Sequence, residues 1–386
     1  MVTLNNAENA LKTIYLGAVT ELLNVKANPL LSKIEQTSVD VWGKDVRTAA
    51  RVGINGGIGA GDEAGALPAA HGSNYIQFVS TLKNLYGQIE ISDKAIRASA
   101  DGRGAFTDLL NSELESLLAA SKFNLGRMLY GDGSGKLCEI TLSSDGQYMA
   151  SSTVNIIEGM VVDVYDADRA LSNSGLRISY IDRDRSIVKF ASVPMVAITS
   201  GSTLYVQGSK DREITGLGAL FDVSKPLYGL SRNDYPFLSP RTKEVNGFLN
   251  ELTIQIEIDK LERDSNSTVD FIAASADAKY SYINYMKQFK RNVDMVELNS
   301  GYKTISYNGI PFVHDRFVED GAMYLLDTTA FKLHQLCDWR YLENENGKIL
   351  RQTQGKPTYT ATLVKYCDLI CSRPNGQAKL VNIAYD

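Results

Sequence analysis

The sequence predicts an α+β protein with segments that project from its body. Three observations lead to this fold class. Residues 106–130 carry a long apolar stripe at helical spacing, and residues 151–208 hold several short apolar runs separated by turn residues. Beyond Pro240, helical and strand-like patterns alternate. A helix, a small β module and a mixed region therefore follow one another along the chain.

The composition is that of a folded globular protein. The chain has 386 residues, of which 44% are hydrophobic and 22% charged, and its net charge is -5. Without a basic surplus, tight binding to a phosphate backbone is not expected. The longest apolar run, near residues 193–198, is far shorter than the roughly 18 residues that a membrane span needs. Four cysteines without a visible secretory leader indicate free thiols in a reducing cytosol.

The first 92 residues predict an arm and a long hairpin. Residues 3–31 have the spacing of an amphipathic helix that stops near Pro29, and we interpret it as a peripheral arm. Alternating segments then flank a glycine-rich loop from Gly53 to Gly72, which cannot hold a regular element. A hairpin with a flexible tip should therefore project from the body over residues 38–92. Its apolar positions are expected to lack local partners: Val39, Val41, Trp42, Ile76 and Phe78.

The middle of the chain predicts a bracing helix and an inserted module. The helix over residues 106–130 ends at Gly131, and the stretch that follows is interpreted as a loop. Turn residues then recur at intervals of about 12 residues, which is typical of a small antiparallel barrel or sandwich. Its expected strands are residues 160–165, 176–181, 187–190 and 203–206.

The last third predicts an α+β domain. A helix over 242–263 should follow Pro240, with a buried strand over 269–274 and a second helix over 276–289. Two further pairs of strands are expected, one around an Asp-Gly turn and one around Pro357. The first pair is 310–318 with 322–326, and the second is 348–354 with 358–371.

Two glycine motifs resemble nucleotide sites only formally. Residues 59–64 fit a dinucleotide pattern, but Gly65 and Pro68 interrupt the helix that should receive the pyrophosphate. Residues 131–136 are one residue too short for a phosphate-binding loop, and Leu137 stands where Ser or Thr is required. We interpret the first motif as a loop tip and the second as the turn that ends a helix.

The candidate metal and catalytic residues do not form a convincing site. A zinc site would need His334, Cys337, Cys367 and Cys371, yet the last two lie about 13 Å apart if residues 358–371 are a strand. Buried thiols are the better interpretation. The other histidines are His71 and His314, and His314 points away from its neighbour Asp315 on a strand. The acidic and basic run at 182–185 is interpreted as a solvated turn. We therefore assign no catalytic, cofactor-binding or metal-binding residue, and expect no enzyme activity.

Six strings, taken in order, resemble the major capsid proteins of tailed bacteriophages with the Hong Kong 97-type fold. The resemblance covers nearly the whole chain from residue 10 onwards. The strings are ALKTIYLGAVTELL (10–23), TLKNLYGQIEISDKAIRAS (81–99), RMLYGDGSGKL (127–137), YVQGSKDREITGLGALF (205–221), LYGLSRNDYPFLSP (227–240) and NGIPFVHDRFVEDGAMYLLD (308–327). Their order is more specific than any one of them.

The resemblance implies a Hong Kong 97-like capsid fold with seven segments. They are an N-terminal arm (1–37), an extended loop (38–92), a peripheral domain with a long spine helix (93–150), an inserted β-barrel-like domain (151–217), a mainly axial domain (218–345), a hairpin returning to the peripheral domain (346–371) and a C-terminal segment (372–386). Some family members form covalent crosslinks between Lys and Asn side chains. Lys44, Lys83 and Asn375 are present, but no motif supports transferring that chemistry.

The resemblance also implies the function and the partners. The protein would assemble with itself as hexamers and pentamers into an icosahedral-type shell around double-stranded DNA, bound without sequence specificity. A separate scaffolding protein and a portal are the expected partners, with assembly in the bacterial cytoplasm and a final place in the virion. Whether decoration proteins also bind stays open. Two alternatives stay open: a nanocompartment shell of the same fold that packages an enzyme, and a nucleotide-binding enzyme that uses the Gly53 to Gly72 loop.

Overall fold

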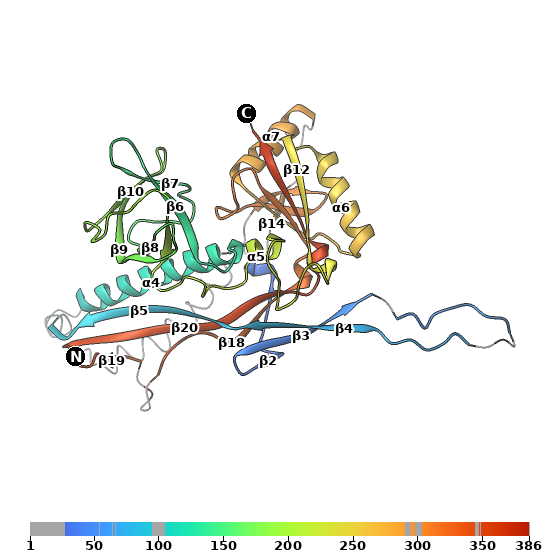
Figure 1. Ribbon diagram of the computed structural model, residues 1–386, viewed down its shortest axis with the longest axis horizontal. Helices are drawn as coiled ribbons and strands as arrows, with labels where there is room; N and C mark the ends of the chain where they lie inside the picture. Colours follow the sequence, from blue (N-terminus) through green and yellow to red (C-terminus); the bar gives the residue numbers. More distant parts are fainter. Residues whose placement is uncertain are drawn as a thin grey trace.

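Three open sheets, one closed barrel and three long helices make up the described part of the chain (Figure 1). The computed structural model describes residues 28–53, 55–63, 65, 67–94, 105–289, 295–297, 303–343, 347 and 349–385. Nearly all of the arm helix predicted over 3–31 lies outside these residues. None of the helices in the described ranges is long and apolar enough to cross a membrane. The α+β class is confirmed.

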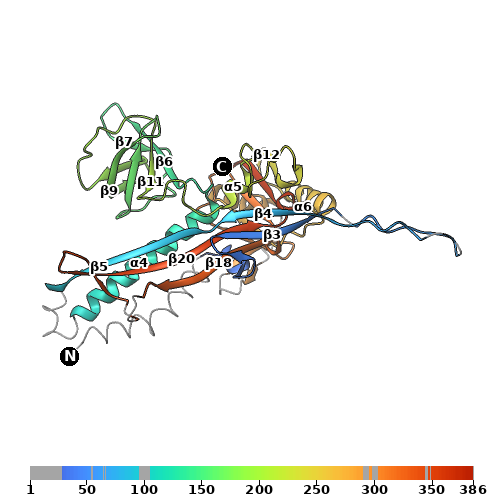
Figure 2. The ribbon, with the colours of Figure 1, turned by 60° about the horizontal axis from the view of Figure 1, so that its bottom comes forward.

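The longest strands form a sheet that runs along the body. The central strand β20 (Thr358–Cys371) is antiparallel to β5 (Lys83–Ser92) on one side and to β18 (Phe331–Tyr341) on the other. Two short strands complete this sheet: β1 (Glu35–Thr37), parallel to β18, and β19 (Arg351–Gln352), paired with β20. Figures 1 and 2 both show helix α4 (Ala105–Tyr130) lying along this sheet.

Helix α4 confirms the helix predicted over residues 106–130, and its C-terminal half is the better-buried part among the described side chains. Leu118, Leu125 and Leu129 lie in the largest hydrophobic core, together with residues of β5, β18 and β20. Helix and sheet approach closely at Gly87 of β5, where a Cβ atom would lie 2.9 Å from Cδ1 of Leu117. A side chain at this position would therefore force the Leu117 side chain to move.

The inserted module is a closed six-stranded barrel with a core of its own. The strand order is β10-β7-β6-β11-β8-β9. The predicted strands are found as β8 (Val161–Tyr165), β9 (Leu171–Asp182), β10 (Ile187–Phe190) and β11 (Ser202–Val206). Two more, β6 (Lys136–Leu142) and β7 (Tyr148–Ala150), occupy the stretch interpreted as a loop, so that interpretation was wrong. They were missed because partners distant in sequence complete their pairing: β11 for β6 and β10 for β7.

A seven-stranded mixed sheet, flanked by two helices, forms the other lobe of the body (Figure 1). Its order is β12-β21-β17-β13-β16-β15-β14. The strand bounds are β12 (Arg241–Phe248), β13 (Phe271–Ala274), β14 (Met295–Glu297), β15 (Lys303–Tyr307), β16 (Ile310–His314), β17 (Met323–Leu326) and β21 (Ala378–Ala384). The helices are α6 (Glu251–Ser265) and α7 (Ala276–Phe289). Strand β13 and helix α7 confirm the predictions for 269–274 and 276–289.

Two predictions for this lobe were wrong. Residues 242–248 are a strand rather than the start of a helix, because β12 pairs in parallel with β21. Helix α6 starts only after Asn250, whose side chain caps it by accepting a hydrogen bond from the Thr253 amide at 2.8 Å. Strands β16 and β17 do not pair with each other, because β13 lies between them. The first error came from apolar spacing that fits both structures, and the second from a strand supplied by a distant segment.

The predicted hairpin is divided between two sheets. Strands β3 (Asp45–Val52) and β4 (Asn74–Thr81) lead into the projecting part, and the short β2 (Val41–Trp42) pairs with β3 at its base, as Figure 1 shows. Strand β5, which was assigned to the same projection, instead belongs to the sheet of β20. The second predicted hairpin is confirmed in part: Arg351 and Gln352 pair antiparallel with β20 across the turn at Pro357, but the main neighbours of β20 are β5 and β18.

Candidate functional site

The projecting hairpin carries the most prominent exposed apolar side chains near the N-terminal end of the described chain. Ile58 and Leu67 in the loop between β3 and β4 are 77% and 90% exposed, and Trp42 of β2 is 70% exposed. The loop has no helix or strand among its described residues. Ile58 and Leu67 lie in the loop at the end of the projection, whereas Trp42 lies near its base, because it pairs with Asp45. Such water-exposed apolar side chains are typical of a surface that becomes buried against another molecule.

The base of the hairpin belongs to the core, contrary to one expectation. Phe78 of β4 was expected to lack local partners, but it is fully buried, and so is Val46 of β3. The Phe78 ring lies 5.3 Å from the ring of Tyr228 and stacks at 6.4 Å on the ring of Phe237. Both rings come from the segment that leads from the barrel to the seven-stranded lobe. Of the other positions, Val39 and Trp42 are exposed, while Val41 and Ile76 are half-buried.

A buried carboxylate joins three segments at this base. Asp368 of β20 accepts hydrogen bonds from the Ser80 hydroxyl of β4, from the Thr215 amide at 2.7 Å and from the Thr215 hydroxyl at 3.1 Å. Burial raises the pKa of Asp368, while the hydrogen bonds from Ser80 and Thr215 and the nearby Lys83 ammonium act in the opposite direction. The carboxylate is thus held by the hairpin and by the chain leaving the barrel.

The raised pKa of Asp368 predicts how stability changes with pH. A carboxyl whose pKa is raised on folding contributes full stability below its unfolded pKa, near 3.9, and that contribution is lost as the pH rises through the raised pKa. Asp368→Asn removes this titration. From acidic to neutral pH, the wild type should therefore lose stability relative to the variant. The loss is about 1.4 kcal/mol for every pH unit that separates the folded pKa from the unfolded one.

The measurement is the free energy of urea unfolding of both proteins at a series of pH values. Tyr228 and Cys367, which lie beside Asp368, do not titrate between acidic and neutral pH. Burial raises the pKa of Tyr228 well above its usual value and that of Cys367 to about 12. Two curves that stay parallel over the whole range would show that the folded protein does not perturb Asp368.

A second junction ties the long helix to the barrel exit. Arg127 of α4 and Glu213 form a two-pronged ion pair at 2.9 and 2.5 Å, with both side chains 3% exposed. Gly216 follows closely and packs against the end of the same helix, where a Cβ atom would collide with the Met128 carbonyl oxygen. The orientation of the barrel relative to the helix is therefore fixed by charge pairing and by close backbone contact.

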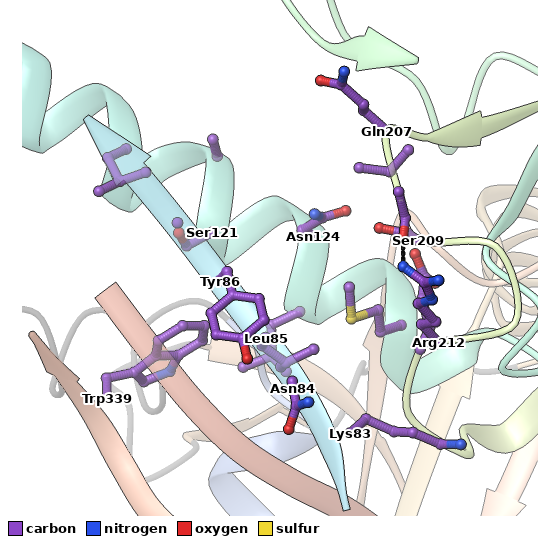
Figure 3. A pocket seen from close by; sticks show the side chains of 18 of the residues that line it. Lys83, Asn84, Leu85, Tyr86, Ser121, Asn124, Gln207, Ser209, Arg212 and Trp339 are labelled. Carbon is purple, nitrogen blue, oxygen red and sulfur yellow. Dashed lines mark hydrogen bonds between the residues drawn. The ribbon is translucent and has the colours of Figure 1, made fainter. Parts of the chain in front are cut away.

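The described side chains that line the groove beside this junction carry balanced charges. It encloses about 610 Å³ between α4, β5 and residues 206–213, with Trp339 at one side (Figure 3). Its charged side chains are balanced: Lys83 and Arg212 against Asp211 and Glu213. Glu213 is already paired with Arg127. The groove does not present the one-signed charge that would select a phosphate or a metal ion.

The other motif residues lie in separate places. His71 is exposed in the hairpin loop, while His334 is buried on β18 with its Nδ1 3.0 Å from the Val39 carbonyl oxygen. His314 is exposed and Asp315 buried, as the alternation predicted. Among the described residues, no group of three or more potential ligands is placed to hold a metal ion.

The cysteines and the glycine motifs follow their simpler interpretations. Cys367 and Cys371 lie on one continuous strand, and burial raises the pKa of each thiol to about 12. Cys337 was also expected to be buried but is only half-buried. The motif at 131–136 is a turn that leads into β6, and the described residues that follow the motif at 59–64 within the hairpin loop are not helical. Residues 182–185 span the end of β9 and the turn of residues 183–186 that leads to β10.

Sequence reasoning missed the residues that organise both junctions. Ser80 and Asp368 are 288 positions apart, and Arg127 and Glu213 are 86 apart. No local pattern marks such pairs, because each residue taken alone resembles an ordinary surface position.

Comparison with solved structures shows the fold. The chain superimposes on the cyanophage A-1(L) capsid asymmetric unit with a TM-score of 0.54 and 13% identity, covering 94% of this chain and 93% of the other. Two further similar structures are an encapsulin complex from Synechococcus elongatus PCC 7942 (TM-score 0.48, 11% identity, 94% and 91% covered) and the satellite phage P4 procapsid (0.44, 10%, 96% and 99%). No family model and no curated protein matches the sequence. The chain therefore has the Hong Kong 97-type fold of tailed-phage capsid proteins.

Proposed function

We propose that this chain is the major capsid protein of a tailed bacteriophage. It assembles with copies of itself as hexamers and pentamers into an icosahedral-type shell that encloses double-stranded DNA. The observation that carries the proposal is the projecting hairpin, whose exposed Ile58, Leu67 and Trp42 lack cover within the described chain. The near full-length likeness to the cyanophage capsid chain supports it at the level of the fold.

In this proposal each lobe has a place in the shell. The β2, β3 and β4 hairpin is the extended loop that lies on a neighbouring subunit, and α4 with the β20 sheet is the peripheral domain. The seven-stranded lobe is the axial domain, which contacts other copies around each hexamer or pentamer. The barrel is an inserted domain. Residues 1–37 are the N-terminal arm, whose last residues join the body where β1 pairs with β18.

The role is structural rather than enzymatic, and the partners follow from it. A separate scaffolding protein guides assembly in the bacterial cytoplasm, and a portal binds the same shell. The net charge of -5 suits a shell that encloses DNA without tight or sequence-specific binding.

The test is assembly of the protein with the products of its neighbouring genes, followed by electron microscopy and analysis of the particle contents. Closed particles of pentamers and hexamers that take up DNA are expected. Closed particles that instead retain one cargo enzyme would replace this proposal with the nanocompartment alternative. Absence of closed particles under all these conditions, from a protein that is folded by circular dichroism, would reject a shell function.

A further inference from the structure

Three consecutive residues of β4 attach the projecting hairpin to the body. Phe78 contacts the rings of Tyr228 and Phe237, as described above. The next residue, Val79, donates its backbone amide to the Tyr228 carbonyl oxygen at 3.2 Å. Ser80 then donates its hydroxyl to the buried Asp368 carboxylate. The hairpin is therefore held through a ring contact, a backbone hydrogen bond and a side-chain hydrogen bond in direct succession.

Tyr228 occupies a backbone conformation that a bulky side chain rarely adopts. Its φ is +51° and that of Gly229 is +78°, in a two-residue turn closed by reciprocal hydrogen bonds between Leu227 and Leu230 at 3.0 and 2.9 Å. Asn, Asp or Gly usually occupies the first position of such a turn. A strained residue persists only where its surroundings hold it, and such residues gather at functional positions.

The surroundings do hold Tyr228. Its hydroxyl accepts a hydrogen bond from the Cys371 amide of β20 at 2.9 Å. Arg232 holds the backbone around Tyr228 in place, because its guanidinium donates hydrogen bonds to four backbone carbonyl oxygens. These belong to Lys225, Ala219, Leu220 and Leu238. The ring that meets Phe78 is thus fixed from both sides.

We propose that Tyr228 and Asp368 are positioning residues that set the direction in which the hairpin leaves the body. This inference rests on the proposed function, because the direction matters only if the tip must reach a site on a neighbour. Strands rise about 3.3 Å per residue, so a tip about 20 residues beyond the contacts moves by roughly 10 Å when its base turns by about 10°. Small changes at the base therefore become large errors at the tip.

The test compares two neighbouring hydroxyls of β4. Ser80→Ala removes the hydrogen bond from the hairpin to Asp368, whereas Thr81→Ala removes a hydrogen bond of 3.2 Å to Asp45, which lies within the hairpin itself. Ser80→Thr retains a hydroxyl and serves as the rescue. Amide hydrogen exchange on the unassembled protein, thermal unfolding and electron microscopy of assembled particles are measured for all three variants.

We expect exchange of the Val79 amide to become about 10-fold faster in Ser80→Ala than in Thr81→Ala. The melting temperature of Ser80→Ala should also be the lower of the two, because only this variant takes a donor from a buried carboxylate. The Ser80→Ala particles should vary in size and curvature, whereas those of Thr81→Ala and Ser80→Thr should match the wild type. Equal Val79 exchange in the two alanine variants, or faster exchange with unchanged particles, would overturn the inference. If the wild type itself forms no particles, the proposed function fails, and the exchange result alone decides whether the contacts hold the hairpin.

Discussion

Replacing residues 53–73 by a short Gly-Ser turn is expected to abolish closed shells and to leave the body folded. The replacement removes Ile58 and Leu67 but retains the β3 and β4 ladder between Asp45 and Thr81. Phe78 and Val46 stay in the core. Burial of each lost side chain on a neighbour would contribute about 1.5–3 kcal/mol, repeated at every subunit contact.

A length-matched control separates the apolar side chains from the length of the loop. Ile58→Ser combined with Leu67→Ser retains the whole loop and should raise the protein concentration needed for assembly by roughly 100-fold. The wild type, the shortened variant and the double-serine variant are compared by circular dichroism for folding, and by size-exclusion chromatography and electron microscopy for assembly. Normal shells from the shortened variant would contradict the role of the tip, and its unfolding would show that the tip belongs to the core.

Replacing Arg127 by Met should cause a large loss of stability, because it breaks a buried ion pair. The substitution leaves Glu213 buried beside α4 without its cation. Removal of one partner of a buried ion pair costs about 3–5 kcal/mol, a large part of a total stability of roughly 5–15 kcal/mol. The free energy of urea unfolding should fall by that amount.

An exposed pair of the same geometry provides the control. Arg183 and Glu158 meet through two hydrogen bonds of 2.9 Å, with side chains 48% and 41% exposed. Arg183→Met should cost less than about 1 kcal/mol, because water screens that pair. The double variant Arg127→Met with Glu213→Leu should recover most of the stability, since it removes both charges. Equal losses for Arg127→Met and Arg183→Met would show that burial does not decide the effect.

Local patterns in the chain were sufficient to predict several elements. The apolar spacing of residues 106–130 and the run at 276–289 each specify a helix without reference to the rest of the molecule. The short strands after residue 160 were visible because turn residues separate them. Such signals depend on neighbours within a few positions, and those neighbours are the same in the sequence and in the fold.

Pairings and junctions depended on the tertiary structure. The apolar spacing of residues 242–263 was compatible with a continuous helix, and only the approach of β21 makes its first part a strand. The place of β5 in the body was likewise decided by β20, about 275 positions away.

The chain alone indicated the α+β class, the projecting hairpin and, through a resemblance of ordered strings, the capsid fold that the structural comparison shows. The contacts that hold the hairpin were decided in three dimensions. Asp368 gains its importance from Ser80 and Thr215, and Tyr228 from Phe78, none of them near it in sequence. The physical reason is that burial, which raises the pKa of Asp368, is a property of a packed environment, and that environment exists only once distant segments have met.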